Sequence, residues 1–217
     1  MPHDQEHESP LGSHVRQSTI YNLQSTIVNG LRRIKASMDA QSVNPKHRMT
    51  IIGVMGDGQV HGYNPHAYEL GTLIALAGFV LLTGGGAGVM HLASQGAHDA
   101  GGLVVGILPS EHETDPKFIQ GRYPNPYVHI PIFTGMGDAR NVINVTSSDV
   151  VVALCGGAGT LSEIALALKA GKHVIILDWP DLTLPDSCPN HLVHYVDDAQ
   201  SALEKITEIQ AFKTSYS

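Results

Sequence analysis

The sequence lacks most features that mark exported, membrane-bound or zinc-binding proteins. Its 217 residues include two cysteines, Cys155 and Cys188, which form neither a C-x-x-C pair nor a zinc-binding spacing. No stretch reaches the roughly 18 apolar residues of a membrane helix, and no apolar signal segment stands near the N-terminus. These absences predict a reduced, cytoplasmic chain that contacts no membrane. Residues 9–38 are basic and rich in Ser and Thr, so organellar import stays open.

Positive charge is also scarce. The chain has 13 Lys and Arg residues against 20 Asp and Glu residues, a net charge of -7, and no segment concentrates the basic residues. Such a chain is poorly suited to neutralise the phosphates of an extended nucleic acid, so nucleic acid is not an expected partner. A single phosphate or nucleotide remains a candidate ligand, because backbone amides bind it without basic side chains. The 42% hydrophobic and 15% charged residues are typical of a soluble globular protein.

The pattern of apolar residues divides the chain into a tail over residues 1–49 and a domain over residues 50–217. Within the tail, apolar residues recur every three or four positions over residues 18–38. This spacing predicts an amphipathic helix, which would pack on the domain or on another subunit. The polar stretch over residues 39–49 predicts a linker between that helix and the domain.

In the domain, apolar segments alternate with segments of helical pattern. The apolar segments are continuous, as in strands that helices bury on both faces. Asn64 and Pro65 predict the cap and the first residue of a helix over residues 65–77. The fold class is therefore α/β, a doubly wound, mostly parallel, Rossmann-like sheet with helices on both faces. The strands are predicted at residues 49–56, 79–82, 103–109, 128–133, 149–154, 173–177 and 192–196, and a last helix at 198–211.

Three predicted strands end in glycine-rich loops, at residues 56–58, 84–88 and 156–160. Glycine lets the backbone approach a ligand closely, and a following helix presents unpaired N–H groups and a partial positive charge. In parallel sheets, ligands bind beyond the carboxyl ends of the strands, where the strand order reverses. The loops therefore predict a phosphate-like anion site, although each alone is equally compatible with a tight turn. Neither a P-loop nor a complete dinucleotide fingerprint occurs, which disfavours nicotinamide chemistry.

Glu163 has two interpretations. If the helix after the third loop is capped by Gly159 or Thr160, Glu163 can complete a capping box with the Thr160 N–H. In the other interpretation, Glu163 faces the crevice, where Arg140 joins it beside a bound phosphate. Spacing alone leaves both open.

Other reactive side chains suggest no further chemistry. His91 and His98 lack the i, i+4 spacing of a metal-binding helix face, so no metal site is expected. Cys155 ends a predicted buried strand, where we expect it to act as a small hydrophobic residue. Ser162 lacks the G-x-S-x-G turn of a hydrolase nucleophile.

The two longest glycine segments resemble a known superfamily. "TGGGAGVMHLASQGAHDAGGLVVGILP" followed by "GMGDARNVINVTSSDVVVALCGGAGTLSEIALALKAGKHVIIL" is similar to the SLOG superfamily, including its branch of molybdenum cofactor carrier proteins. The resemblance covers residues 50–178. A second branch, the LONELY GUY-type phosphoribohydrolases once labelled lysine decarboxylases, cleaves nucleoside monophosphates with an arginine and a glutamate. The resemblance assigns these two roles to Arg140 and Glu163.

Two departures from the hydrolase motifs favour the carrier branch. Asn141 follows Arg140 where the hydrolases have Lys, and Cys155 precedes the glycines where they have Pro. A carrier would bind the molybdenum cofactor as cargo, form a homo-oligomer (a dimer or tetramer), and deliver to molybdenum enzymes. The alternatives are a phosphoribohydrolase acting on a nucleoside monophosphate, and a nucleotide-sensing module.

For the carrier, Glu163 is expected to cap its helix and line the pocket, with catalysis by Arg140 and Glu163 kept for the hydrolase alternative. The expected ligand-binding residues are Gly56, Gly84, Gly85, Gly86, Ala87, Gly88, Val89, Met90, Arg140, Asn141, Gly156, Gly157, Ala158, Gly159, Thr160 and Glu163.

Overall fold

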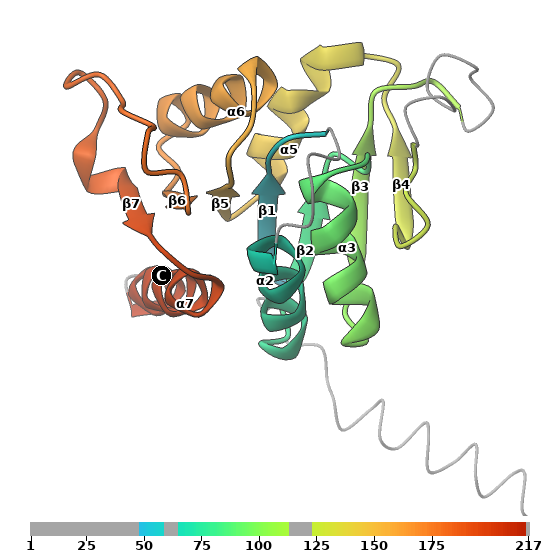
Figure 1. Cartoon of the computed structure of the whole chain (residues 1–217), viewed down its shortest axis with the longest axis horizontal. Helices are drawn as coiled ribbons and strands as arrows, with labels where there is room; N and C mark the ends of the chain where they lie inside the picture. Colours follow the sequence, from blue (N-terminus) through green and yellow to red (C-terminus); the bar gives the residue numbers. More distant parts are fainter. Residues whose placement is uncertain (1–47, 59–64, 113–122, 216–217) are drawn as a thin grey trace, which may run out of the picture. The chain divides into compact units, whose positions relative to one another are not determined.

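The computed structural model describes residues 48–58, 65–112 and 123–215. The predicted tail helix and the Asn64 cap lie outside these ranges, so they and the proposed boundary near residue 49 stay predictions. The strands are β1 (Ile51–Met55), β2 (Val80–Thr83), β3 (Val104–Leu108), β4 (Ile130–Phe133), β5 (Val150–Ala153), β6 (Val174–Leu177) and β7 (Val193–Val196). The helices are α2 (Pro65–Leu76), α3 (Val89–Asp99), η1 (Gly137–Arg140), α5 (Asn141–Ser147), α6 (Ala158–Lys169), η2 (Asn190–Leu192) and α7 (Ala199–Ser215) (Figure 1).

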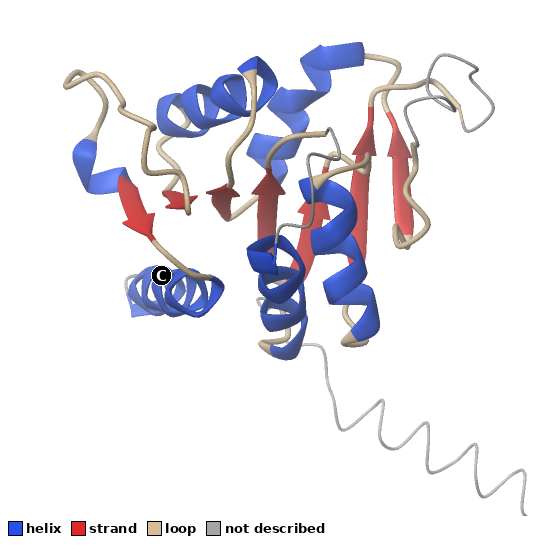
Figure 2. Ribbon diagram, in the orientation of Figure 1, coloured by secondary structure: helices blue, strands red, loops and turns tan. Residues whose placement is uncertain are grey.

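The strands form one seven-stranded sheet in the order β4-β3-β2-β1-β5-β6-β7, and every neighbouring pair is parallel. Figure 2 shows this sheet with helices on both faces. The chain builds outward from β1 to β4 on one side and returns to the other side of β1 with β5. The strand order therefore reverses between β1 and β5, where α/β sheets bind ligands. The predicted doubly wound α/β fold is confirmed.

Two hydrophobic clusters fill the two faces of the sheet. On one face, α2 packs between α3 and α7, and side chains such as Leu70, Ala93 and Ile206 meet the sheet there. On the other face, α5 and α6 pack together, and Val145 and Ile164 contribute to the second cluster. Because both faces are covered, the central strands are buried along their length, which explains their continuous apolar sequence.

The element boundaries follow the sequence with a few differences. The helix predicted over residues 65–77 is confirmed as α2, and the final helix extends beyond the predicted residue 211 to Ser215. The segment before β5 begins as the 3-10 turn η1 and continues directly as α5. None of the helices in the described ranges is long and apolar enough to cross a membrane.

Candidate functional site

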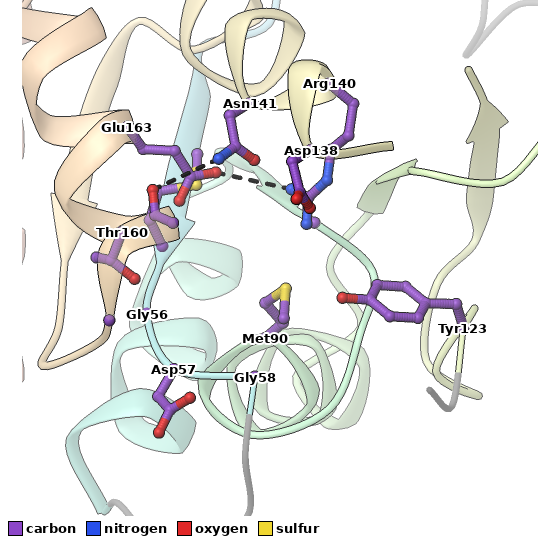
Figure 3. A pocket seen from close by; sticks show the side chains of 14 residues that line it. Gly56, Asp57, Gly58, Met90, Tyr123, Asp138, Arg140, Asn141, Thr160 and Glu163 are labelled. Carbon is purple, nitrogen blue, oxygen red and sulfur yellow. Dashed lines mark hydrogen bonds and ion pairs between the residues drawn. The ribbon is translucent and has the colours of Figure 1, made fainter. Parts of the chain in front are cut away.

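A pocket of about 210 Å³ lies beyond the carboxyl ends of β1, β2 and β5, at the reversal of strand order (Figure 3). Pockets that enclose a drug-sized ligand measure about 300–1,000 Å³. The pocket that the described residues form is smaller than this range. The pocket is lined by Met55, Gly56, Asp57, Gly58, Gly84, Met90, Tyr123, Asp138, Arg140, Asn141, Gly157, Gly159, Thr160 and Glu163.

The structure brings together nine of the sixteen expected site residues. Those that line the pocket are Gly56, Gly84, Met90, Arg140, Asn141, Gly157, Gly159, Thr160 and Glu163. Those that do not are Gly85, Gly86, Ala87, Gly88, Val89, Gly156 and Ala158. Five lining residues were not expected: Met55, Asp57, Gly58, Tyr123 and Asp138.

The loop over residues 84–88 uses many of its polar groups within the protein. The Gly85 N–H donates to Thr83 Oγ1 at 3.0 Å, so this amide is not directed at a ligand. The Gly85 carbonyl accepts from the Asn125 N–H at 2.7 Å, and the Gly86 carbonyl accepts from Asn125 Nδ2 at 3.0 Å. The loop over residues 84–88 thus uses one amide and two carbonyls in hydrogen bonds within the protein, and only Gly84 of this loop lines the pocket.

The glycine that does line the pocket, Gly84, makes room for Arg140. A Cβ placed on Gly84 would collide with the Arg140 guanidinium and lie 2.7 Å from its Cζ. The Arg140 side chain is 10% exposed, which is low for an arginine, and the buried Nε has no partner in the described part of the chain. The absence of a side chain at residue 84 therefore lets the guanidinium lie flat against the backbone at the end of β2.

Glu163 and Arg140 meet in the pocket. Arg140 Nη1 lies 3.6 Å from Glu163 Oε1, and the same oxygen accepts a 2.7 Å hydrogen bond from Asn144 Nδ2. Glu163 is 5% exposed. Burial raises the pKa of its carboxyl above the ordinary value, while the Asn144 hydrogen bond and the Arg140 charge oppose this shift. The carboxylate is thereby fixed in one orientation at the pocket wall.

The predicted capping role of Glu163 is wrong. The helix α6 begins at Ala158 with Gly157 as its N-cap, two or three residues earlier than expected. Glu163 consequently lies in the second turn, too far along the helix to reach a first-turn N–H as a capping box requires. Its observed partners are Asn144 and Arg140 instead, which supports the interpretation in which Glu163 faces the crevice.

The start of α6 presents backbone amides to the pocket. The first hydrogen bond of the helix runs from the Leu161 N–H to the Gly157 carbonyl, so the N–H groups of Ala158, Gly159 and Thr160 have no partner within the helix. A Cβ placed on Gly157 or on Gly159 would meet no atom of the described residues within 4 Å. An anionic group can therefore approach this helix end closely, where the helix dipole favours negative charge.

Asn141 and Cys155 occupy the two positions that depart from the hydrolase motifs. Asn141 Nδ2 donates to Ser162 Oγ at 3.0 Å and more weakly to the Gly159 carbonyl at 3.4 Å, so it ties α5 to α6. Cys155 is exposed and follows β5, which contradicts its expected role as a buried small residue. The strand β5 ends at Ala153, and burial of the segment that leaves it ends at Leu154, one residue before Cys155.

Asn144 is a contact of Glu163 that sequence reasoning did not find. It follows Arg140 by four residues, and this spacing places both side chains on one face of the η1–α5 segment. That signal was present in the sequence. Tyr123 offered no such signal, because it lies in a polar connection without periodicity.

Two solved structures similar to this chain are molybdenum cofactor proteins. The solved molybdenum cofactor binding protein of Rippkaea orientalis is 44% identical, with a TM-score of 0.63, and the match covers 76% of this chain and 99% of that one. The molybdenum cofactor carrier protein of Chlamydomonas reinhardtii is 41% identical, with a TM-score of 0.65 and the same coverage.

A more distant relative belongs to the phosphoribohydrolases. The cytokinin riboside 5′-monophosphate phosphoribohydrolase LOG5 of Arabidopsis thaliana is 32% identical over 154 residues, which are 70% of this chain and 64% of that protein. The expected resemblance to both branches is confirmed. Residues 49–212 match the SLOG cluster4 family, and the chain belongs to that family.

Proposed function

We propose that the chain binds and carries the molybdenum cofactor as its cargo. The observation that carries this proposal is the 41–44% identity with solved molybdenum cofactor binding and carrier proteins over 99% of their length. The cofactor is a pterin with a phosphate and a dithiolene-bound molybdenum oxo group. The pterin already holds the metal, so the protein needs contacts to an anionic, partly aromatic molecule rather than a set of metal ligands.

The start of α6 and Arg140 suit the anionic part of that cargo. The N–H groups of residues 158–160 have no partner within the helix, and no side chain caps them, so they can donate to an anion. The Arg140 guanidinium adds a charged donor. The Gly157 and Gly159 positions leave the approach open. Noncovalent contacts of this kind also permit release, which a carrier requires.

The arrangement around Glu163 supports a carrier over a hydrolase. Asn141 supplies no positive charge where the hydrolases have Lys, and its amide is engaged with α6. The Glu163 carboxyl is held by the Asn144 hydrogen bond and the Arg140 charge. We infer that Glu163 positions Arg140 and lines the pocket instead of acting on a ribose.

A phosphoribohydrolase is the second candidate, favoured by one observation. Arg140 and Glu163, the two residues that the hydrolase motifs require, meet in the same pocket. The family relatives include such enzymes. A nucleotide-sensing module would use the same pocket without consuming its ligand.

The proposed carrier is a cytoplasmic homo-oligomer that hands its cargo to molybdenum enzymes. Val142 and Leu161, on α5 and α6, are 46% and 43% exposed, and apolar side chains of this size on neighbouring helices suit contact with a second copy.

Parallel assays of uptake and turnover test the proposal. The full chain is incubated with isolated molybdenum cofactor and, separately, with AMP. We expect retention of pterin and molybdenum after gel filtration and no release of adenine. Adenine and ribose 5-phosphate formed by the wild type, and abolished in Glu163→Gln, would replace the carrier by the hydrolase. Tight AMP binding without turnover or cofactor uptake would favour the sensing module.

A further inference from the structure

The side of the pocket opposite α6 has an aromatic wall. Tyr123 lines the pocket together with Met90, and Figure 3 shows the Tyr123 hydroxyl pointing toward the interior from the side opposite Thr160. The phenol ring lies against the glycine loop over residues 84–88. A Cβ placed on Gly86 would lie 2.6 Å from ring atoms Cε1 and Cζ, so the ring approaches the backbone as closely as only glycine permits.

Asn125 fixes this wall to the loop. It is 2% exposed, and its backbone N–H and side-chain amide donate to the carbonyls of Gly85 and Gly86. Its Oδ1 accepts a 3.2 Å hydrogen bond from the Tyr127 N–H. This buried side chain therefore ties residues 125–127 to the loop that follows β2. The glycine loop over residues 84–88 therefore supports the pocket wall that Tyr123 forms.

The two sides of the pocket differ in chemistry. The α6 side offers unpaired amides and the positive end of a helix dipole, with Arg140 nearby. The Tyr123 side offers a planar aromatic ring and the Met90 thioether, both suited to an uncharged planar group. The first turn of α3, which carries Met90, also faces the pocket, but its Val89 N–H already donates to the Asp57 carbonyl at 2.9 Å. The first three N–H groups of α6 have no partner within their helix, and Arg140 lies 3.6 Å from Glu163 of the same helix, so an anionic group gains more donors on the α6 side.

We propose that Tyr123 binds the planar heterocycle of the ligand and thereby sets the direction in which the ligand lies. The ring lies between Tyr123 and Met90, and the anionic end lies at the start of α6 beside Arg140. This inference rests on the proposed function for the identity of the ligand, but its geometry holds for any planar heterocycle joined to a phosphate. A pocket wall of this kind favours ligands that carry a planar heterocycle over ligands that lack one.

Binding measurements on three ligands test this role. We titrate the full-length wild type and three variants, Tyr123→Ala, Tyr123→Phe and Tyr127→Ala. The ligands are isolated molybdenum cofactor, AMP and ribose 5-phosphate, and the last of these keeps the phosphate but lacks the planar heterocycle. Aromatic stacking of a base contributes about 1–3 kcal/mol, so Tyr123→Ala should weaken binding of the ring-bearing ligands about 5- to 100-fold. Ribose 5-phosphate binding should change less than about twofold, and Tyr123→Phe should retain most of the affinity because the ring remains.

Tyr127 provides the matched control. Its ring packs against His91 and His98, with centroids 5.1 and 5.4 Å away, and it does not line the pocket. Tyr127→Ala should leave all three affinities unchanged. An equal loss for ligands with and without the ring, an equal loss in both alanine variants, or no loss in Tyr123→Ala would overturn the inference.

Failure of the proposed function is a separate result. Wild type that takes up no cofactor but binds AMP removes the carrier proposal, and the Tyr123 contrast is then decided with AMP. Wild type that binds neither ring-bearing ligand removes both proposals.

Discussion

The two glycine loops look alike in sequence and differ in what they do. In the loop over residues 84–88, Gly84 makes room for Arg140 and Gly86 makes room for Tyr123. In the loop that leads into α6, Gly157 and Gly159 have open space around them and precede or carry unpaired N–H groups. The first loop positions side chains from elsewhere, and the second presents its own backbone. Glycine runs at strand ends therefore do not identify a ligand-binding backbone by themselves.

Removing Arg140 should have the largest effect on ligand binding. Arg140→Met keeps the length of the side chain and removes the charged donor that the first loop positions. Hydrogen bonds to charged groups contribute about 1.5–3 kcal/mol, so uptake of the cofactor should weaken about 10- to 100-fold. Equilibrium dialysis measures this change. Unaltered affinity would mean that the amides of α6 hold the anion alone and that the first loop plays no part in binding.

A pair of glycine substitutions compares the loops directly. Gly84→Ala forces the buried guanidinium to move, and we expect it to cost about 1–3 kcal/mol of unfolding free energy and to weaken cofactor uptake. Gly157→Ala makes the same chemical change in open space, so its cost should stay within about 1 kcal/mol. Urea unfolding gives both values. Equal costs in the two variants would remove the distinction between the loops.

The pH dependence of the unfolding free energy tests the raised pKa of the Glu163 carboxyl. Burial raises the pKa of Glu163, so the folded state binds its proton more tightly than the unfolded state does. This contribution to stability is present at pH below the ordinary value of 4.5 and is lost as the pH rises through the folded pKa. Glu163→Gln removes the titration. The unfolding free energy of wild type relative to this variant should therefore fall as the pH rises above 4.5.

Urea unfolding of wild type and Glu163→Gln across this pH range measures the difference. A difference that is constant with pH, or that rises with pH, would contradict a raised pKa.

The smallest effect is expected at Asn141. Asn141→Ala removes the two hydrogen bonds to α6, of 3.0 and 3.4 Å, which lie at a partly exposed site. We expect a loss of about 0.5–1 kcal/mol in unfolding free energy and little change in cofactor uptake. Thermal unfolding and dialysis report the two quantities. A loss of uptake comparable with that of Arg140→Met would assign Asn141 to the binding surface instead.

The fold and half of the site could be predicted from sequence because both depend on local patterns. Continuous apolar runs mark the buried strands, and glycines after β1, β2 and β5 mark the ligand end of the sheet. The pairing of Arg140 with Glu163 followed from the motif resemblance and is observed at 3.6 Å.

The remaining features depend on contacts between distant residues. The start of α6 was misplaced because its N-cap is Gly157, which has no side chain to signal a cap. The structural role of the first loop depends on Asn125, which lies far from it in sequence and reaches both carbonyls through hydrogen bonds. Tyr123 enters the pocket through the same segment. No periodicity or motif encodes such contacts, so only the folded chain reveals them.

The content of the purified protein tests the central claim most directly. Full-length chain is isolated from cells that make the molybdenum cofactor, and molybdenum by mass spectrometry and pterin by fluorescence after oxidation and denaturation are measured per protein chain. A carrier should contain both at nearly equal amounts, approaching one of each per chain. Protein that contains no pterin, and that takes up none when isolated cofactor is supplied, would contradict the account.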